Sequence, residues 1–170
     1  MEIRDTVLDD FAEITAIYNE VLANSTAIYN DRPASCEERI AWWRSRQAQE
    51  YPVLVAVDGS NVRGFASFGD FRYGPGYRFT VECTVHIQSE SRGQGIGNEL
   101  MKSLIARARA LEKHTMIAAV DSGNAASLRF FEAIGFERVA HLKEVGFKFN
   151  RFLDLVLLQY RLTPPKGEQG

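Results

Sequence analysis

Arg92-Gly93-Gln94-Gly95-Ile96-Gly97 is the stretch of sequence that decides the fold of this chain. It follows a β-like run, Thr80 to Ile87, and precedes a helical run, Asn98 to Ile105. A glycine-rich turn between a strand and a helix binds anions well. Its glycines let the backbone come close, and the free N–H groups of the first helical turn point at the ligand. The sequence therefore predicts a ligand that carries phosphate.

The elements expected around this turn form a mixed sheet. Strands are expected near Ile3 and at 53–57, 64–68, 79–87, 115–120, 141–147 and 152–162, and helices at 11–22, 35–43, 98–111 and 124–134. Early hairpins predict antiparallel pairing, whereas the crossover from Val81 to Val120 predicts a parallel pair. We expect an α/β fold with a mixed, largely antiparallel twisted sheet flanked by helices, including a β–glycine turn–α–β unit.

The ends of the helices carry their own signals. Asp9 or Asp10 is expected to cap the first helix, and Ser35 with Glu38 has capping-box spacing for the second. Gly135 is expected to end the last helix.

Composition limits the classes of protein that fit. The 170 residues are 45% apolar and 25% charged with a net charge of −2, which predicts one domain, residues 1–163, followed by a flexible tail at 164–170. The charge gives no case for nucleic acid or an anionic membrane, and no apolar run approaches a membrane span. The N-terminus lacks a signal peptide's apolar core, so we expect a cytoplasmic protein. Cys36 and Cys83 lack metal-ligand spacing, so reduced thiols and no metal are expected.

Several ligands compete for the glycine turn, and a tight turn without any ligand is one alternative. A dinucleotide fingerprint and a Walker loop both fail on spacing. Arg92-x-x-Gly95-x-Gly97, together with the segments Asn124 to Leu128 and Phe131 to Phe136, resembles the coenzyme A motifs of the GCN5-related N-acetyltransferases. The segments Ser25 to Tyr29, Thr80 to Val85 and Val145 to Lys148 resemble the phosphinothricin and methionine sulfoximine N-acetyltransferases in particular.

This resemblance implies an acetyl-CoA-dependent N-acetyltransferase for small amino-acid-like amines that forms a homodimer. It implies that the strand before the turn pairs with the pantetheine arm, that the turn holds the pyrophosphate and that one asparagine adds a further cofactor contact. The residues implied are Val85, His86, Ile87, Arg92, Gly93, Gln94, Gly95, Ile96, Gly97, Asn98 and Asn124.

Glu82 is the candidate general base, because a glutamate inside an apolar strand is costly unless it is used or paired. Burial would raise its pKa toward the working range of a base. The alternative is a structural pair with Arg72 or Arg78. Strand alternation puts Cys83 on the opposite face, which favours a core cysteine over a nucleophile.

The acceptor site is less well defined by the sequence. An amino acid presents a carboxylate, for which arginine is suited, and family likeness favours two short substrate-lining segments: Arg72, Tyr73, Gly74, Glu82, Cys83 and Thr84. Tyr29 is expected to supply an aromatic wall, with a partly buried loop tyrosine as the alternative. Many relatives use a tyrosine to protonate the leaving thiolate, but Phe130-Phe131 stands in that region, which leaves His86 or direct release. Another small amine, a peptide N-terminus, or a non-catalytic acyl-CoA-binding module remain alternatives.

Overall fold

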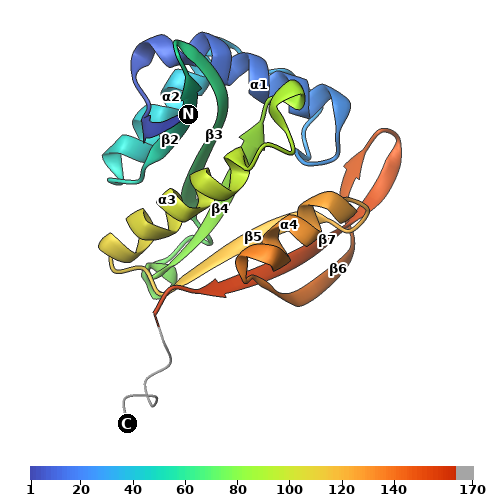
Figure 1. The fold of residues 1–170 in the computed structure, drawn as a ribbon. Coiled ribbons are helices and arrows are strands. Elements are labelled where there is room, and N and C mark those ends of the chain that lie inside the picture. The colour runs from blue at the N-terminus through green and yellow to red at the C-terminus, as the bar shows by residue number, and fades with distance from the viewer. Residues whose placement is uncertain (164–170) are drawn as a thin grey trace.

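Residues 1–163, which the computed structural model describes, form a seven-stranded sheet in the order β1-β2-β3-β4-β5-β7-β6 (Figure 1). The strands are β1 Glu2–Asp5, β2 Val53–Asp58, β3 Asn61–Asp70, β4 Thr80–Ile87, β5 Thr115–Asp121, β6 Glu137–Lys148 and β7 Arg151–Arg161. Neighbours pair antiparallel except β4 and β5, which are parallel. The predicted mixed sheet is confirmed, and the predicted tail at 164–170 lies outside the described residues.

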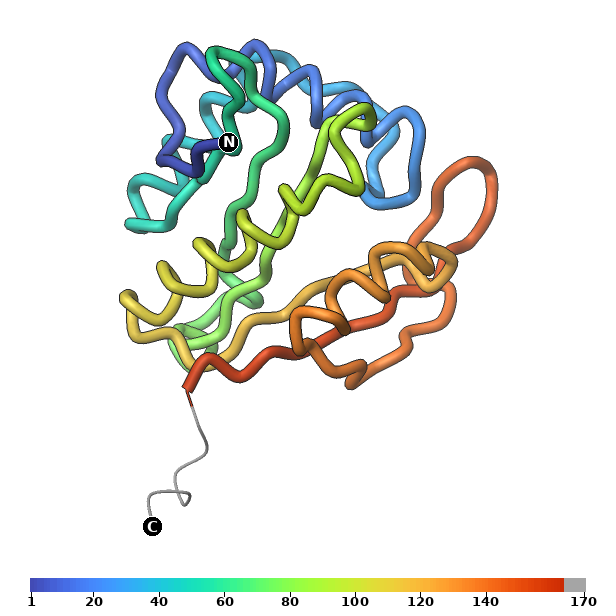
Figure 2. Tube along the Cα trace, viewed as in Figure 1, coloured from blue at the N-terminus to red at the C-terminus, as the bar shows by residue number. Residues whose placement is uncertain are grey.

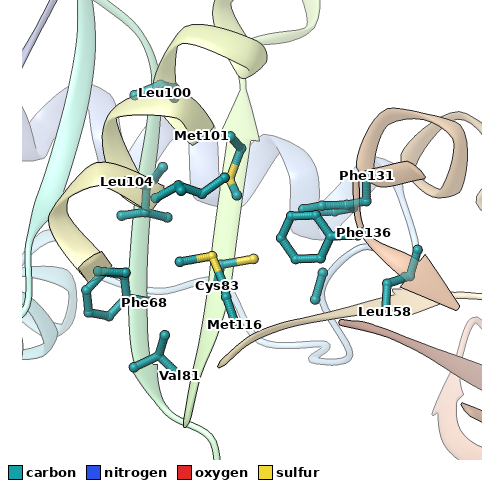
Figure 3. Packing of buried hydrophobic residues seen from close by; sticks show 14 of the residues in the cluster. Phe68, Val81, Cys83, Leu100, Met101, Leu104, Met116, Phe131, Phe136 and Leu158 are labelled. Atoms are coloured by element: carbon teal, nitrogen blue, oxygen red, sulfur yellow. The ribbon is translucent and has the colours of Figure 1, made fainter. Parts of the chain in front are cut away.

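Helices cover both faces of the sheet. Helices α1 (Phe11–Asn24) and α2 (Cys36–Ala48) cover one face, and α1 contributes Phe11, Ile14 and Ile17 to a core with β2 and β3. Helices α3 (Ile96–Ala110) and α4 (Ala125–Ile134) pack on the other face over a larger core. Figure 3 shows this core: Cys83 and Met116 meet at its centre, Met101 of α3 lies next to them, and Phe131 and Phe136 lie on the α4 side.

Two of the three predicted helix-end signals are confirmed. The Ser35 hydroxyl accepts from Glu38 N at 3.1 Å and the Glu38 carboxylate accepts from Ser35 N at 2.8 Å, while Gly135 ends α4 with φ 114°. The prediction that an aspartate side chain caps α1 is wrong. A 3₁₀ turn, Leu8–Asp10, precedes the helix, and the Asp10 carboxylate accepts instead from Val7 N and from Arg4.

Strand β6 begins at Glu137, four residues before the start expected at 141. Its first residues pair with β7, starting with Glu137 opposite Gln159. The segment from Glu137 to Val139 is exposed, so it has no buried apolar positions to mark it as a strand in the sequence.

The parallel pair of strands separates soon after it forms, and this separation positions the site. Strands β4 and β5 pair only at Thr80, Val81 and Glu82, opposite Thr115, Met116 and Ile117. Beyond this point the two strands diverge, as the chain trace in Figure 2 shows. The edge of β4 from Cys83 to Ile87 therefore faces a wedge rather than a neighbouring strand, directly before the glycine turn.

Candidate acetyl-transfer site

Two cavities meet at the wedge between β4 and β5. The larger one, which we name the turn cavity, is about 560 Å³ and lies between the end of β4, the glycine turn and α4. The smaller one, the inner cavity, is about 270 Å³ and reaches α1, α2 and the end of β5. Six residues line both: Ala27, Val85, His86, Asn124, Ser127 and Phe131. The two cavities therefore adjoin, and we name their junction the passage between the glycine turn and the opposite face of the sheet.

The glycine turn has the backbone geometry of an anion site. Gly93 and Gly95 have φ values of 74° and 80°, a left-handed conformation that side chains disfavour. Gly97 lies against α4, because a Cβ there would come within 3.0 Å of the Phe130 ring. Helix α3 starts at Ile96 with its first N–H groups available to a ligand. These features fit the pyrophosphate of a nucleotide-like cofactor.

Most of the predicted cofactor residues come together in the turn cavity. Its lining includes Val85, His86, Ile87, Arg92, Gly93, Gly95, Ile96, Gly97, Asn98 and Asn124. Gln94 is not among them, and its side chain donates to Glu90 O. Arg92 Nε donates to Ile87 O at 3.3 Å, which holds its guanidinium beside the strand end. Asn124 Oδ1 accepts from Ser127 N at 3.1 Å, so this residue caps α4 and also lines both cavities.

Comparison with known proteins identifies the family of this site. Residues 14–136 match the sequence model of the acetyltransferase (GNAT) family. The chain belongs to this family. The glycine turn, β4 and α4 of the acetyltransferase all lie within the matched region.

The acetyltransferase has close relatives over nearly its whole length. The L-methionine sulfoximine/L-methionine sulfone acetyltransferase of Pseudomonas paraeruginosa is 45% identical over 166 residues, which cover 97% of this chain and 96% of the relative. Phosphinothricin N-acetyltransferase of Alcaligenes faecalis is 40% identical over 156 residues, 91% and 79% of the two chains.

A solved structure gives the same result for the fold. The phosphinothricin acetyltransferase of Sinorhizobium meliloti in complex with acetyl-CoA matches with a TM-score of 0.91 at 35% identity, covering 98% of this chain and 94% of that one. The predicted family, fold and enzyme class, an N-acetyltransferase, are confirmed.

Glu82 of the acetyltransferase lies half-buried on β4, on the face covered by α2. Burial raises the pKa of its carboxyl group, while the positive charges of Arg46 and Arg72 oppose the increase. Arg46 comes from α2 and its guanidinium packs over Gly69, the residue opposite Glu82 in β3. Within residues 1–163 Glu82 has no ion pair, so the structural pair with Arg72 or Arg78 is not formed.

Glu82 also stands just outside the two cavities of the acetyltransferase. Among the described residues, the inner cavity is lined by Thr84, two positions further along the same face of β4, but not by Glu82. Its carboxylate can therefore reach a bound amine directly only from the edge of the cavity, or through one water molecule.

Cys83 and His86 have defined protonation states. Cys83 is 7% exposed, with its side chain in the large core, and it also borders the inner cavity. Burial raises the pKa of its thiol, which disfavours the thiolate that a nucleophile needs. Burial also lowers the pKa of His86 to about 4, and the charges of Arg39 and Arg92 add to this effect. Its imidazole is therefore neutral near pH 7.

The other predicted acceptor residues lie outside the two cavities in the described part of the chain. Tyr29 OH donates to Asp154 O at 3.0 Å and to Asp121 Oδ1 at 3.3 Å, and the pKa of Tyr29 rises to about 12 through burial and the Asp121 charge. Its neighbours Ala27 and Ile28 line the inner cavity instead. Arg72 lies near Glu82, Tyr73 is fully exposed, and Gly74 has φ 119°.

Sequence reasoning missed several residues that line the inner cavity, namely Tyr18, Arg39, Trp42, Asp121 and Ser127. One signal could have found part of this set. Positions 39, 42, 43 and 46 recur at helical spacing, so two arginines share one face of α2 with both tryptophans. The aromatic face of an amphipathic helix packs against the protein, so arginines on that face are expected to be buried.

Proposed function

We propose that this enzyme transfers the acetyl group of acetyl-CoA to the amine of a small amino-acid-like acceptor of the methionine sulfone, methionine sulfoximine or phosphinothricin type. The observation that carries the proposal is the passage through the sheet, because it lets a thioester held on the α3 side meet an amine held on the α2 side. The names of the relatives support this acceptor class.

Acetyl-CoA would be held by backbone groups more than by side chains. The N–H groups from Gly93 to Asn98, Gln94 included, would bind the pyrophosphate with Arg92 beside them. The free edge of β4 at Val85, His86 and Ile87 would hydrogen-bond the pantetheine amides as an added strand does. Asn124, at the start of α4, would contact the arm where the two cavities meet.

The transfer would be direct, without a covalent enzyme intermediate. Glu82 removes a proton from the acceptor ammonium, directly or through water, and the amine nitrogen then attacks the thioester carbonyl carbon. The N–H of Val85 stabilises the oxyanion of the tetrahedral intermediate. The nitrogen of this intermediate then gives its second proton to water. When the C–S bond breaks, the thiolate takes a proton from water, because Phe130 and Phe131 carry none and a thiol with a pKa of about 8.5 leaves readily.

The acceptor would be held at the Glu82 end of β4. Arg72 lies close enough to Glu82 to oppose its pKa increase, so its guanidinium would bind the acceptor carboxylate next to the base. Tyr73, Gly74, Cys83 and Thr84 would line this part of the site, with Tyr29 supporting the facing loop.

We further propose a cytoplasmic homodimer built from one domain, residues 1–163, without a metal or a nucleic-acid or membrane partner. Apolar side chains exposed on β6, β7 and their hairpin support a dimer, and they include Val145, Phe147, Phe149 and Phe152. Tyr73, 102% exposed next to Arg72, would then be covered near the site. Two free cysteines support a reducing compartment. No helix within residues 1–163 has the length and apolar run of a membrane span.

A panel of amines at a fixed acetyl-CoA concentration tests the proposal, with CoA release followed by a thiol reagent. We expect release with methionine sulfone, methionine sulfoximine or phosphinothricin. Release with none of these three but with another amine would refute the acceptor class. Acetyl-CoA binding without release on any amine would favour a non-catalytic module.

A further inference from the structure

Arg39 is a buried cation that points into the inner cavity. It lies on α2, is 9% exposed and lines the cavity next to Trp42. Its Nε has no hydrogen-bond partner, and within residues 1–163 the guanidinium forms no hydrogen bond or ion pair. Burial lowers the pKa of Arg39 to about 10, which leaves it charged at neutral pH. A buried, charged donor set without an acceptor is costly, so this site is built for a ligand.

Two aromatic rings lie beside the Arg39 guanidinium without accepting hydrogen bonds from it. The Cζ atom lies 4.2 Å from the centroid of the Tyr18 ring and 4.0 Å from that of Trp42. A ring accepts no conventional hydrogen bond, so these cation–π contacts do not satisfy the five N–H groups of the guanidinium. Its donors therefore stay available for oxygen atoms of a molecule in the cavity.

Arg39 is the one cation in the lining of the inner cavity among the described residues. His86, which also lines it, is neutral near pH 7 because its pKa is about 4. Asp121 lines it as well, and its carboxylate accepts from Thr26 Oγ1 at 2.6 Å. The other Asp121 oxygen accepts from Tyr29 OH at 3.3 Å, so both oxygens of this carboxylate have protein partners, and within residues 1–163 Arg39 is the charged group of the cavity that lacks one.

Two arginines act at different places along β4. The charge of Arg72 opposes the pKa increase of Glu82, whereas the charge of Arg39 helps to lower the pKa of His86. His86 lies four residues further along the strand than Glu82, with Thr84 between them. At a rise of about 3.3 Å per residue the two strand positions are about 13 Å apart. An amino acid with its α-carboxylate and α-amine at one end and a second oxygen-rich group at the other end fits this order of groups.

We propose that Arg39 binds the oxygen atoms on the side-chain sulfur or phosphorus of the acceptor, while Arg72 binds its α-carboxylate. This inference rests on the proposed function and narrows it to amino acids whose side chain ends in a sulfone, sulfoximine or phosphinate. A thioether is a poor hydrogen-bond acceptor and would leave the guanidinium unsatisfied. The enzyme would therefore bind an acceptor that lacks these oxygens more weakly and use it less efficiently.

Methionine sulfone and methionine differ only in the two oxygens on sulfur, so this pair of acceptors tests the proposal. In Arg39→Gln we expect KM for methionine sulfone to rise about 10-fold to 100-fold, which corresponds to the loss of a charged hydrogen bond. KM for methionine and for acetyl-CoA should stay within about twofold of wild type. Arg44→Gln, at an exposed arginine of the same helix, is the matched control and should change none of them.

A merely structural arginine would give a different pattern. Loss of the stacking on Tyr18 and Trp42 alone would raise KM for both acceptors equally, and that result would overturn the proposal. If Arg39→Gln does not fold, Arg39→Lys is the second variant, because it keeps the positive charge but loses the planar guanidinium that donates two parallel hydrogen bonds. An unchanged preference of Arg39→Lys for the sulfone over methionine would overturn the proposal as well.

Calorimetric binding of methionine sulfone to the wild-type protein with CoA separates this proposal from the proposed function. Binding that is about tenfold tighter than for methionine and that is lost in Arg39→Gln, but without turnover, would support the Arg39 site and refute only the proposed function. Turnover of both acceptors with equal KM in the wild type would refute only the Arg39 site. If methionine sulfone neither binds nor is turned over, both proposals are overturned.

Discussion

Lys148→Met tests how the loop beside the inner cavity is held in place. Lys148 on β6 is 2% exposed, and its ammonium group donates to three carbonyl oxygens: Leu22 O at 2.6 Å, Ser25 O at 2.8 Å and Ile28 O at 2.7 Å. Leu22 lies in the last turn of α1, and Ile28 lines the inner cavity. Methionine keeps most of the apolar stem but removes all three donors.

The expected loss of stability follows from these contacts. Hydrogen bonds to a charged group are worth about 1.5–3 kcal/mol each, so three give roughly 5–9 kcal/mol before costs. The cost of burying the ammonium group cancels several kcal/mol of this stabilisation. In the variant, the carbonyl groups of the partly exposed Ser25 and Ile28 can form hydrogen bonds with water instead. We expect a net loss of about 2–4 kcal/mol, or roughly 4–16 °C in Tm for a chain of this size.

Urea unfolding gives the stability change, and hydrogen exchange of the amides from Ser25 to Tyr29 reports on the loop. We expect faster exchange there and a higher KM for the acceptor, because Ala27 and Ile28 line its cavity. Lys143→Met, at an exposed lysine of the same strand, is the control and should change neither. A loss below about 1 kcal/mol with unchanged exchange would refute the reasoning.

Three further substitutions test the site. Glu82→Gln should abolish most turnover across neutral pH while acetyl-CoA still binds, and wild-type turnover would exclude Glu82 as the base. Since burial raises the pKa of Glu82, the folded state binds its proton more tightly, and the contribution of this one group to stability falls as pH rises above about 4.3. The variant should therefore unfold at no lower urea concentration than wild type at pH 7. Arg72→Ala should raise KM for a carboxylate-bearing amine more than KM for acetyl-CoA, and equal effects would argue against a substrate role. Gly95→Ala, at φ 80°, should cost about 1–2 kcal/mol and raise KM for acetyl-CoA, whereas an unchanged KM would exclude a role for the turn in binding.

The cofactor side of the site could be predicted from the sequence because its signals are local. Gly93, Gly95 and Gly97 sit at fixed spacing between one strand and one helix, so the turn and its ligand class follow from a short segment. Strand periodicity likewise separated Glu82 from Cys83, and the structure puts the Cys83 side chain in the large core.

The acceptor side could not be predicted in the same way, because it is assembled from distant segments. Arg39, Asp121 and Ala27 come from α2, β5 and the loop after α1, and nothing in one sequence says that they share a cavity. The sequence suggests Tyr29 as an aromatic wall but does not show that its hydroxyl contacts Asp154 and Asp121, which are 125 and 92 residues away.

The short ladder between β4 and β5 also has a mechanical consequence. These strands share three residue pairs, whereas each flanking ladder, β3–β4 and β5–β7, has seven. The sheet therefore consists of two rigid parts, β1 to β4 and β5 to β7, joined by a short ladder, and we expect twisting motions to concentrate at that joint. The turn cavity lies between β4 and α4, and α4 packs against β5 and β6, so a molecule bound there contacts elements on both sides of the joint. The release of CoA at the end of each turnover would then make the domain more flexible. The flexibility of the domain would therefore report whether the enzyme has CoA bound.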